Sequence, residues 1–320
     1  MSAAAPRVSV VVPNYNYAAL LPERMRSILA QTRRDFEVIL LDDASTDDSV
    51  AVLEQYVDPP RVRLVRNAEN GGNPFRQWAR GIALARGAYV WMAEADDSAD
   101  PRLLARCAGV LDAHPNVGLV HCAFRRLDAR GVAEDLSGVW WRDLDAERWR
   151  RDHVAPGAEE LRWLACWNVI SSASGVVFRR AVYDAAGGVD PSFRLAGDWD
   201  LWVRMARLAD VGFVAEPLNL WRWHGGSVRA TAARSGEEQR EVERVLAGLA
   251  RASGAAPETL LASYHRRHAE SALRWRNAPL ARKHAAALLR RRPLDGDTWR
   301  ILLRSGLLLA RTGLRPSRAG

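Results

Sequence analysis

The stretch Val8-Ser9-Val10-Val11-Val12-Pro13-Asn14-Tyr15-Asn16 decides the fold that we expect for this chain. Its first five residues are mostly β-branched and Pro13 ends the run, which is typical of a short strand buried on both faces. Similar apolar runs follow at residues 36–41, 62–65 and 88–92, and segments with helical spacing lie between them. This alternation predicts right-handed βαβ units and a doubly wound, mostly parallel α/β sheet.

The alternation continues for some distance and then gives way to helices. A helix around residues 101–113 and a strand at residues 117–123 extend the βα pattern. From about residue 236 the spacing of apolar residues is helical to the end. We therefore expect one α/β domain over residues 1–235 and a basic helical C-terminal extension over residues 236–320.

Composition excludes several classes of protein. The 320 residues are 48% hydrophobic and 26% charged, which excludes a disordered or collagen-like chain. Cys107, Cys122 and Cys166 form no CxxC pair, so we expect reduced thiols rather than a disulfide framework. No apolar run reaches the roughly 18–20 residues that span a bilayer, and Met1 to Arg7 lack the pattern of a signal peptide. We expect a cytoplasmic protein, either free or peripheral at the inner face of the cell membrane.

The positive charge is concentrated at one end of the chain. Residues 251–320 carry fifteen Lys and Arg against four Asp and Glu, while the whole chain has a net charge of +8. The first 250 residues are therefore net acidic. A high sequence pI of about 10.1 is typical of nucleic-acid binders. The acidic strand ends described next argue against nucleic acid as a partner.

Polar residues follow three of the predicted strands. They are Pro13-Asn14-Tyr15-Asn16, Asp42-Asp43 and Asp96-Asp97. In an open parallel sheet, ligands bind beyond the carboxyl ends of the strands. The sequence contains neither GxGxxG nor GxxxxGK[ST], which disfavours a dinucleotide oxidoreductase and a P-loop enzyme. Because carboxylates repel bare phosphates, a phosphorylated ligand at these acids requires a bridging divalent cation such as Mg²⁺ or Mn²⁺.

Five segments, in this order, carry a resemblance to a known family. They are Val10–Asn16, Asp42–Asp47, Glu94–Asp97, Gly197–Arg204 and Trp221–Ser227. Together they resemble the inverting family 2 glycosyltransferases of GT-A fold, over about residues 7–230. The resemblance divides the domain into a nucleotide-binding half, about 7–100, and an acceptor half, about 101–235.

The resemblance implies a sugar-transfer reaction. The donor is a nucleoside-diphosphate sugar, and the acceptor is a saccharide or lipid-linked molecule in bacterial-type surface polysaccharide or glycoconjugate synthesis. The anomeric configuration inverts, and Mn²⁺ or Mg²⁺ is the cofactor. A carboxylate can accept the imide N–H of uracil or thymine, which points to a UDP- or dTDP-sugar.

The resemblance places the donor on residues of the first half. Asp42 and Asp43 bind the nucleobase and ribose, and Pro13 and Tyr15 shape the base pocket. The alternative for the acidic pair is a solvated turn before a helix. Gln77 contacts the donor from its helix, with a solvated helix face as the alternative. Asp96 faces the ribose or the metal.

The metal site is assigned from the third and fifth segments. The family usually has Asp-x-Asp-Asp, and this chain has Glu94 in the first place. Asp97 and Asp96 are the expected ligands, although acids are also favoured at a helix start such as the one that follows. His224 completes the shell through a neutral imidazole. Its alternative is a structural histidine.

Asp198 is the expected catalytic base. Inversion requires a group that removes the acceptor's hydroxyl proton, and a carboxylate within hydrogen-bond reach can do this. The family usually has Glu-Asp here, so with Gly197 in the first place Asp198 acts alone. Asp200 points away on the helix. Trp199 and Trp202 either line the acceptor pocket or pack in the core.

Two alternatives stay open at the level of the sequence. The departures at Glu94 and Gly197 also fit a catalytically silent module that binds sugar nucleotides or saccharides. Residues 299–311 have apolar residues at helical spacing interrupted by arginines, which fits either an anionic membrane surface or a helix packed on the rest of the protein.

Overall fold

A computed structural model describes most of the chain. The chain forms two compact units in it. The first unit comprises Met1–Leu164 and Val169–Val242, and the second comprises Ala165–Asn168 and Glu243–Gly320. The described residues are 5–127, 133–135, 141, 144–145, 147–222, 237–253, 256–274, 277–291 and 296–312. The predicted domain boundary at residue 235 lies outside them.

The described part of the first unit is built on a single sheet. Along it the strands run in the order β3-β2-β1-β4-β9-β6-β10-β5, with β7 paired to β6 and β8 paired to β10. The strands are β1 (Val8–Asn14), β2 (Phe36–Asp42), β3 (Val62–Arg66), β4 (Tyr89–Met92), β5 (Ser98–Ala99), β6 (Val117–Leu127), β7 (Ala133–Asp135), β8 (His153–Ala155), β9 (Val176–Arg179) and β10 (Asp210–Arg222).

The long pairings in this sheet are parallel. β1 is parallel to β2 and β4, β2 to β3, and β6 to β10. The antiparallel pairings, such as β4 with β9 and β6 with β9, extend over only two or three residue pairs. The predicted mostly parallel α/β sheet is confirmed. The strand β10, which the sequence analysis did not predict, lies between β6 and β5.

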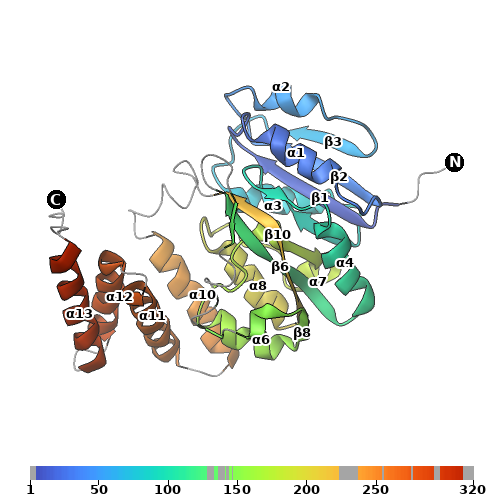
Figure 1. Cartoon of the computed structure of the whole chain (residues 1–320). Coiled ribbons are helices and arrows are strands. Elements are labelled where there is room, and N and C mark those ends of the chain that lie inside the picture. The colour runs from blue at the N-terminus through green and yellow to red at the C-terminus, as the bar shows by residue number, and fades with distance from the viewer. Residues whose placement is uncertain are drawn as a thin grey trace. The chain divides into compact units, whose positions relative to one another are not determined.

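Helices cover both faces of the sheet (Figure 1). Val8, Val10 and Val12 of β1 share a core cluster with Leu21, Met25 and Ile28 of α1. On the other face α3 approaches so closely that a Cβ atom at its Gly81 would lie 2.3 Å from Val11 Cγ1. The helices of this unit are α1 (Leu21–Leu29), α2 (Ser49–Glu54), α3 (Pro74–Ala83), α4 (Leu103–Ala113), α6 (Gly157–Leu164), α7 (Arg180–Ala185) and α8 (Gly197–Ala206), with 3₁₀ turns at Arg148–Arg150 and Ala173–Gly175.

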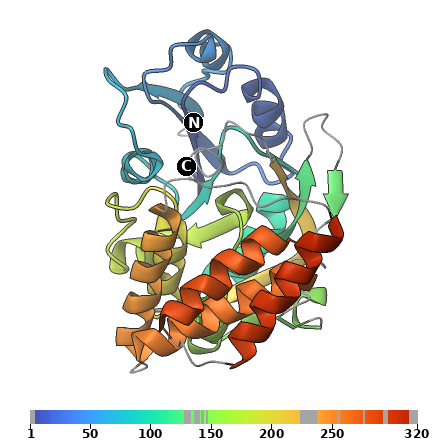
Figure 2. The ribbon, with the colours of Figure 1, turned by 90° about the vertical axis from the view of Figure 1, so that its left-hand side faces the viewer.

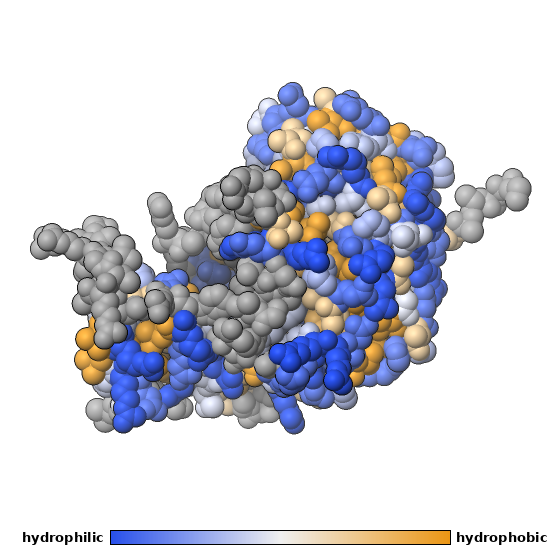
Figure 3. Space-filling view, viewed as in Figure 1, coloured by the Kyte–Doolittle hydropathy of each residue, from blue (hydrophilic) through white to orange (hydrophobic). Residues whose placement is uncertain are grey.

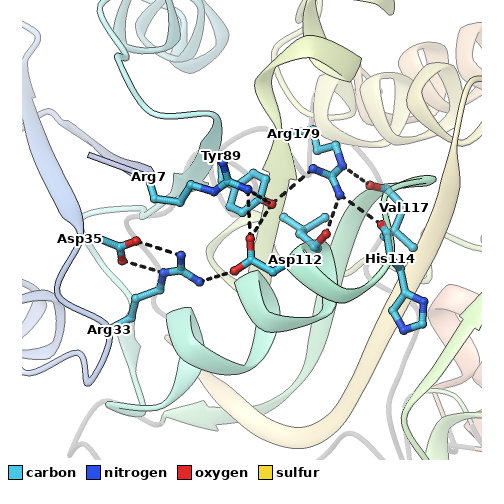
Figure 4. Close-up of polar contacts among 9 residues, drawn as sticks. Arg7, Arg33, Asp35, Tyr89, Asp112, His114, Val117 and Arg179 are labelled. Atoms are coloured by element: carbon cyan, nitrogen blue, oxygen red, sulfur yellow. Dashed lines mark hydrogen bonds and ion pairs between the residues drawn. The ribbon is translucent and has the colours of Figure 1, made fainter. Parts of the chain in front are cut away.

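A polar network ties together the amino ends of the parallel strands (Figure 4). Asp112 of α4 accepts hydrogen bonds from Tyr89 Oη at 2.8 Å, Arg7 Nη2 at 3.1 Å and Arg33 Nη1 at 2.8 Å. Arg179 adds three hydrogen bonds to backbone carbonyls, among them one from Nε to Val117 O at 2.7 Å. Burial raises the pKa of Asp112, but these donors outweigh it and hold the pKa below its usual value. The network lies at the end of the sheet opposite the strand ends that carry the predicted site.

The second unit is helical, as predicted. The chain enters it within α10 (Glu237–Ser253) and continues through α11 (Pro257–Arg274), α12 (Ala278–Arg291) and α13 (Gly296–Thr312). Figure 2 shows α11, α12 and α13 side by side. Small side chains let them pack closely, with Ala269, Ala285 and Ile301 in one core cluster. None of the described helices is both long and apolar enough to cross a membrane.

Candidate active site

A cleft of about 910 Å³ lies in the first unit, at the carboxyl ends of β1, β2 and β4. The sequence analysis assigned roles to nine residues, and seven of them line this cleft. They are Pro13, Tyr15, Asp43, Gln77, Asp96, Asp97 and Asp198. Asp42 does not line it, and His224 lies outside the described residues. The fold therefore gathers acids from three separate chain segments around one cavity.

Asp42 holds two loops together beneath the cleft. It is 1% exposed. One of its oxygens accepts a hydrogen bond from Asn14 Nδ2 at 2.9 Å and the other from Ser45 N at 3.0 Å. The neighbouring Ala44 has a φ of 57° and Asn16 one of 60°, both in the left-handed region. Strained backbone of this kind is maintained only where surrounding contacts over-determine it. Asp42 thus fixes the conformation of the loops that follow β1 and β2.

Asp43 has the opposite orientation and faces the cleft. Its Oδ1 atom accepts hydrogen bonds from Gly71 N at 2.9 Å, Gln77 Nε2 at 2.7 Å and the side-chain amide of Asn67. A carboxylate oxygen with three donors is fixed in position. Gln77 Oε1 is buried and has no hydrogen-bond partner among the described residues. Sequence reasoning missed Asn67 and Gly71, which precede α3 and carry no motif.

Asp96 and Asp97 lie side by side with the more exposed carboxylate on Asp96. Asp97 is 4% exposed and its Oδ1 accepts a hydrogen bond from Arg222 N at 2.9 Å. The Arg222 guanidinium donates from Nε to Asp96 O at 3.0 Å and from Nη2 to Glu23 Oε2 at 2.7 Å. Burial, together with the charge of Asp96, raises the pKa of Asp97 to about 7. The strand β10 therefore fixes the acidic pair.

Glu94 extends this acidic group. Its Oε1 atom accepts a hydrogen bond from Trp78 Nε1 at 2.7 Å. Burial and the charge of Asp96 raise the pKa of Glu94 to about 8. Three carboxyl groups so close together repel one another when ionised, and a bound cation removes that repulsion.

The donor set fits a hard divalent cation. Asp96 and Asp97 offer carboxylate oxygens, which Mg²⁺ and Mn²⁺ prefer together with phosphate oxygens and water. Within the described residues, no group of three or more His, Cys, Asp or Glu is arranged to hold a metal ion by itself. The pair therefore fits a cation whose remaining ligands come from outside these two residues.

A buried arginine lies behind the acids. Arg24 of α1 is fully buried, and its guanidinium carbon lies 4.9 Å from the centre of the Trp91 ring. None of its three side-chain nitrogens has a hydrogen-bond partner among the described residues. Burial lowers the pKa of Arg24 to about 10, although the charges of Asp97, Glu94 and Asp96 act against this shift. The signal that sequence reasoning missed was an arginine on the apolar face of a helix.

Asp198 lies in the first turn of α8 and is half-buried. It lines the cleft, and its Oδ1 atom accepts a hydrogen bond from Trp199 N at 2.7 Å. Asp200 is turned away, with its Oδ2 atom 2.7 Å from Arg204 Nη2. Trp199 and Trp202 are buried and neither lines the cleft. Only Asp198 of this segment therefore faces the cavity.

The chain is similar in sequence to known glycosyltransferases. Residues 9–185 match the sequence profile of glycosyl transferase family 2. The chain is 29% identical over 237 residues to an uncharacterised glycosyltransferase of Nostoc sp., which covers 73% of this chain and 70% of that protein. It is 28% identical over 202 residues to a PGL/p-HBAD biosynthesis glycosyltransferase of Mycobacterium tuberculosis, which covers 63% of this chain and 70% of that one.

Two solved structures have a similar fold. Residues 1–349 of TarS from S. aureus, solved with UDP-GlcNAc, align with a TM-score of 0.64 and 18% identity over 96% of this chain and 92% of that chain. A mannosyltransferase of Pyrobaculum calidifontis, solved with GDP-Man and Mn²⁺, aligns with a TM-score of 0.59 and 21% identity over 97% and 83%. The profile covers more than half of the chain. The protein therefore belongs to glycosyl transferase family 2, and its first unit has the GT-A fold.

Proposed function

We propose that this protein transfers a sugar from a UDP- or dTDP-sugar to a saccharide or lipid-linked acceptor, with inversion. The observation that carries the proposal is that Asp43, Asp96, Asp97 and Asp198 all line the same cleft. TarS was solved with UDP-GlcNAc, and a relative is named for PGL/p-HBAD biosynthesis. The TarS complex supports a nucleotide-sugar donor. The name of the relative supports a glycoconjugate product.

In this proposal the nucleobase binds beside Asp43. With Oδ1 of Asp43 occupied by protein donors, Oδ2 accepts the imide N–H of uracil or thymine. The half-exposed ring of Tyr15 and the ring of Pro13 flank the base. Gln77, which also lines the cleft, contacts the sugar nucleotide beside Asp43.

In this proposal Asp96 and Asp97 would hold Mn²⁺ or Mg²⁺ where the diphosphate binds, with His224 as a further ligand. The metal ion, when bound, stabilises the negative charge on the departing nucleoside diphosphate. Asp97 is kept in place by Arg222 N, and the backbone carbonyl oxygen of Asp96 accepts a hydrogen bond from Arg222 Nε. The buried charge of Arg24 lies behind the pair and reduces their mutual repulsion.

Asp198 takes the proton of the acceptor's hydroxyl group. As that oxygen forms a bond to the anomeric carbon, the bond from this carbon to the phosphate oxygen breaks on the opposite face. The electron pair of that bond leaves with the nucleoside diphosphate, and the proton stays on Asp198. This balance gives one glycosidic bond of inverted configuration.

A thermal-shift screen of nucleoside-diphosphate sugars, with and without Mn²⁺, tests the proposal. We expect the largest Mn²⁺-dependent rise in melting temperature with a UDP- or dTDP-sugar, followed by nucleoside-diphosphate release when saccharides are added. Tight binding without release on any acceptor favours the silent binding module instead.

We also propose that α13 contacts an anionic membrane, where a lipid-linked acceptor would lie. The apolar side chains Trp299, Leu303 and Leu307 are 52%, 67% and 64% exposed. They recur every four residues and so share one face of the helix. The exposed Arg300 and Arg304 follow them on the same outward side. Figure 3 shows apolar and charged surface next to each other on this helix. A helix of this kind binds anionic lipid surfaces.

Liposome sedimentation tests the membrane proposal. We expect the full chain to sediment with phosphatidylglycerol vesicles at low salt and not with phosphatidylcholine vesicles. The double variant Leu303→Gln, Leu307→Gln should remain in solution, whereas Leu208→Gln, which removes an exposed leucine of the first unit, should behave as the parent. Equal sedimentation of all three proteins, or a dimer that the double variant dissociates, contradicts a membrane role.

A further inference from the structure

Glu241 of α10 holds the loop that precedes the predicted catalytic base. Its Oε1 atom accepts a hydrogen bond from Arg194 N at 2.7 Å, and its Oε2 atom accepts from Leu195 N and Ala196 N, each at 2.8 Å. One carboxylate thus binds three consecutive backbone N–H groups. The side chain is 5% exposed, so these hydrogen bonds are shielded from water.

The residues that Glu241 binds lead directly into α8. Ala196 is the residue before the helix, and its own side chain makes no capping hydrogen bond. The first N–H groups of a helix need acceptors, and a negative charge near them is favourable. Glu241 satisfies the backbone just ahead of the helix from a position 45 residues further along the chain. The start of α8 therefore depends on α10 for its conformation.

Residues on both sides of Ala196 line the cleft. Arg194 and Leu195 line the cavity, and so does Asp198, two residues beyond the loop. Glu241 itself does not line the cleft. A shift of the loop would move Asp198 relative to the bound donor, and displacement of about 1 Å can cost about 10²-fold in rate.

We infer that Glu241 is a positioning residue that sets the location of Asp198 for attack by the acceptor. The inference rests on the proposed function, in which Asp198 is the base. It assigns a role in the reaction to the helix that follows the GT-A sheet, outside the segments that resemble the family. Glutamate suits this role because both oxygens are acceptors, whereas glutamine would direct an amide N–H₂ at a backbone N–H.

The test compares Glu241→Gln with Glu243→Gln, a matched change two residues along the same helix, where the carboxylate pairs with Arg291 at 2.7 Å. Hydrogen exchange is the first readout, because it needs no substrate. We expect faster exchange of the amides of Arg194, Leu195 and Ala196 in Glu241→Gln and parental rates in Glu243→Gln. Unchanged exchange in both variants overturns the inference.

The second readout is UDP release from UDP-glucose and UDP-N-acetylglucosamine in the presence of Mn²⁺. We expect Glu241→Gln to lower kcat about ten- to a hundredfold with KM for the donor within twofold. In a background of Asp198→Asn the same change should lower kcat less than twofold, because its effect passes through Asp198. Full additivity of the two changes overturns the inference.

Failure of the proposed function gives a different result. If Asp198→Asn alone retains parental turnover, the assignment of the base is wrong, whatever Glu241 does. If Asp198→Asn abolishes turnover and Glu241→Gln does not change it, the base stands and the positioning role of Glu241 is wrong. Recovery of part of the turnover by Glu241→Asp, which keeps both acceptors, would further support the inference.

Discussion

The aromatic ring of Phe75 fills the space in front of the Cα atom of Gly197. A Cβ atom at residue 197 would lie 2.6 Å from Phe75 Cε2 and 2.8 Å from Cδ2. Phe75 is 4% exposed, and its ring lies 5.3 Å from that of Trp78 in an edge-on arrangement. The glycine at this position, where the family resemblance leads to an expectation of glutamate, is therefore required by packing.

Gly197→Ala should lower the free energy of unfolding by about 1–3 kcal/mol, the usual cost of overpacking. Adding Phe75→Leu should recover part of this loss, because the smaller side chain makes room for the Cβ atom. Urea denaturation measures both effects. Gly109→Ala in α4 is the control, since nothing lies within 4 Å of its Cβ position. A loss in Gly109→Ala as large as that in Gly197→Ala would show that the Phe75 contact is not the cause.

Asp97→Asn should abolish the rise in melting temperature that Mn²⁺ and UDP produce together. It should also lower turnover, because the transition state loses several kcal/mol of stabilisation. Asparagine keeps an acceptor for Arg222 N, whereas alanine leaves that N–H unpaired at a cost of about 1–3 kcal/mol. Asp100→Asn, which removes a partner of Arg102 away from the cleft, is the control. Near-normal Mn²⁺-dependent turnover in Asp97→Asn would rule out the metal assignment.

Asp198→Asn should lower turnover by about 10²–10⁴, the usual contribution of a positioned general base. Donor affinity should stay nearly unchanged, because the amide keeps the size of the side chain and loses only its basicity. Asp200→Asn, at the carboxylate that pairs with Arg204, should retain turnover. Steady-state kinetics and donor titration measure the two quantities. An equal loss of donor affinity in Asp198→Asn would place Asp198 in the donor site.

Acid should destabilise the second unit through three histidines, of which His265 and His284 are buried and His268 is half-buried. Burial lowers the pKa values of His265, His268 and His284 from 6.5 to about 4, 3 and 2. The other charged groups around them are Arg290, Arg291, Lys283 and Glu243. Because the unfolded chain binds protons below pH 6.5 and the folded unit does not, stability should fall as the pH drops. Each histidine contributes up to about 1.4 kcal/mol per pH unit.

Hydrogen exchange of peptides from α11 and α12 between pH 7.5 and 5 measures this effect, after correction for the intrinsic rates. His268→Phe should make the pH dependence shallower, since phenylalanine can stack on Trp167, as His268 does at 3.9 Å, and takes up no proton. His114→Gln, at an exposed histidine of the first unit, should leave these peptides unchanged. A pH dependence identical in the parent and in His268→Phe would exclude the histidine as its source.

The strands that carry the site could be predicted because each is a β-branched or apolar run followed by polar residues. The orientation of an acidic pair could not. Successive side chains of an extended backbone point to opposite sides, so Asp42 turns into the loops and Asp43 turns to the cleft. The sequence analysis assigned both to the donor, since the two residues are chemically identical and only their register separates them.

Contacts between distant segments were also beyond prediction. Arg222 lies 199 residues from Glu23 and 125 residues from Asp97 in the sequence. The strand that carries it, β10, contains Pro217 and pairs with β6 through shifts in register, so its pattern does not resemble a regular strand. The acids of the site were visible as motifs, whereas the groups that hold them in place depend on the folded chain.

The network around Asp112 has a consequence for engineering this protein. It closes one end of the sheet with Arg7, Tyr89 and Arg179, while the loops of the cleft lie at the other end. Substitutions can therefore be confined to one end of the sheet. A combinatorial library in the loops after β1, β2 and β4 leaves the network around Asp112 unchanged. A designer can randomise the loops at the cleft and keep Asp112 constant, so that the contacts at the opposite end of the sheet are not altered.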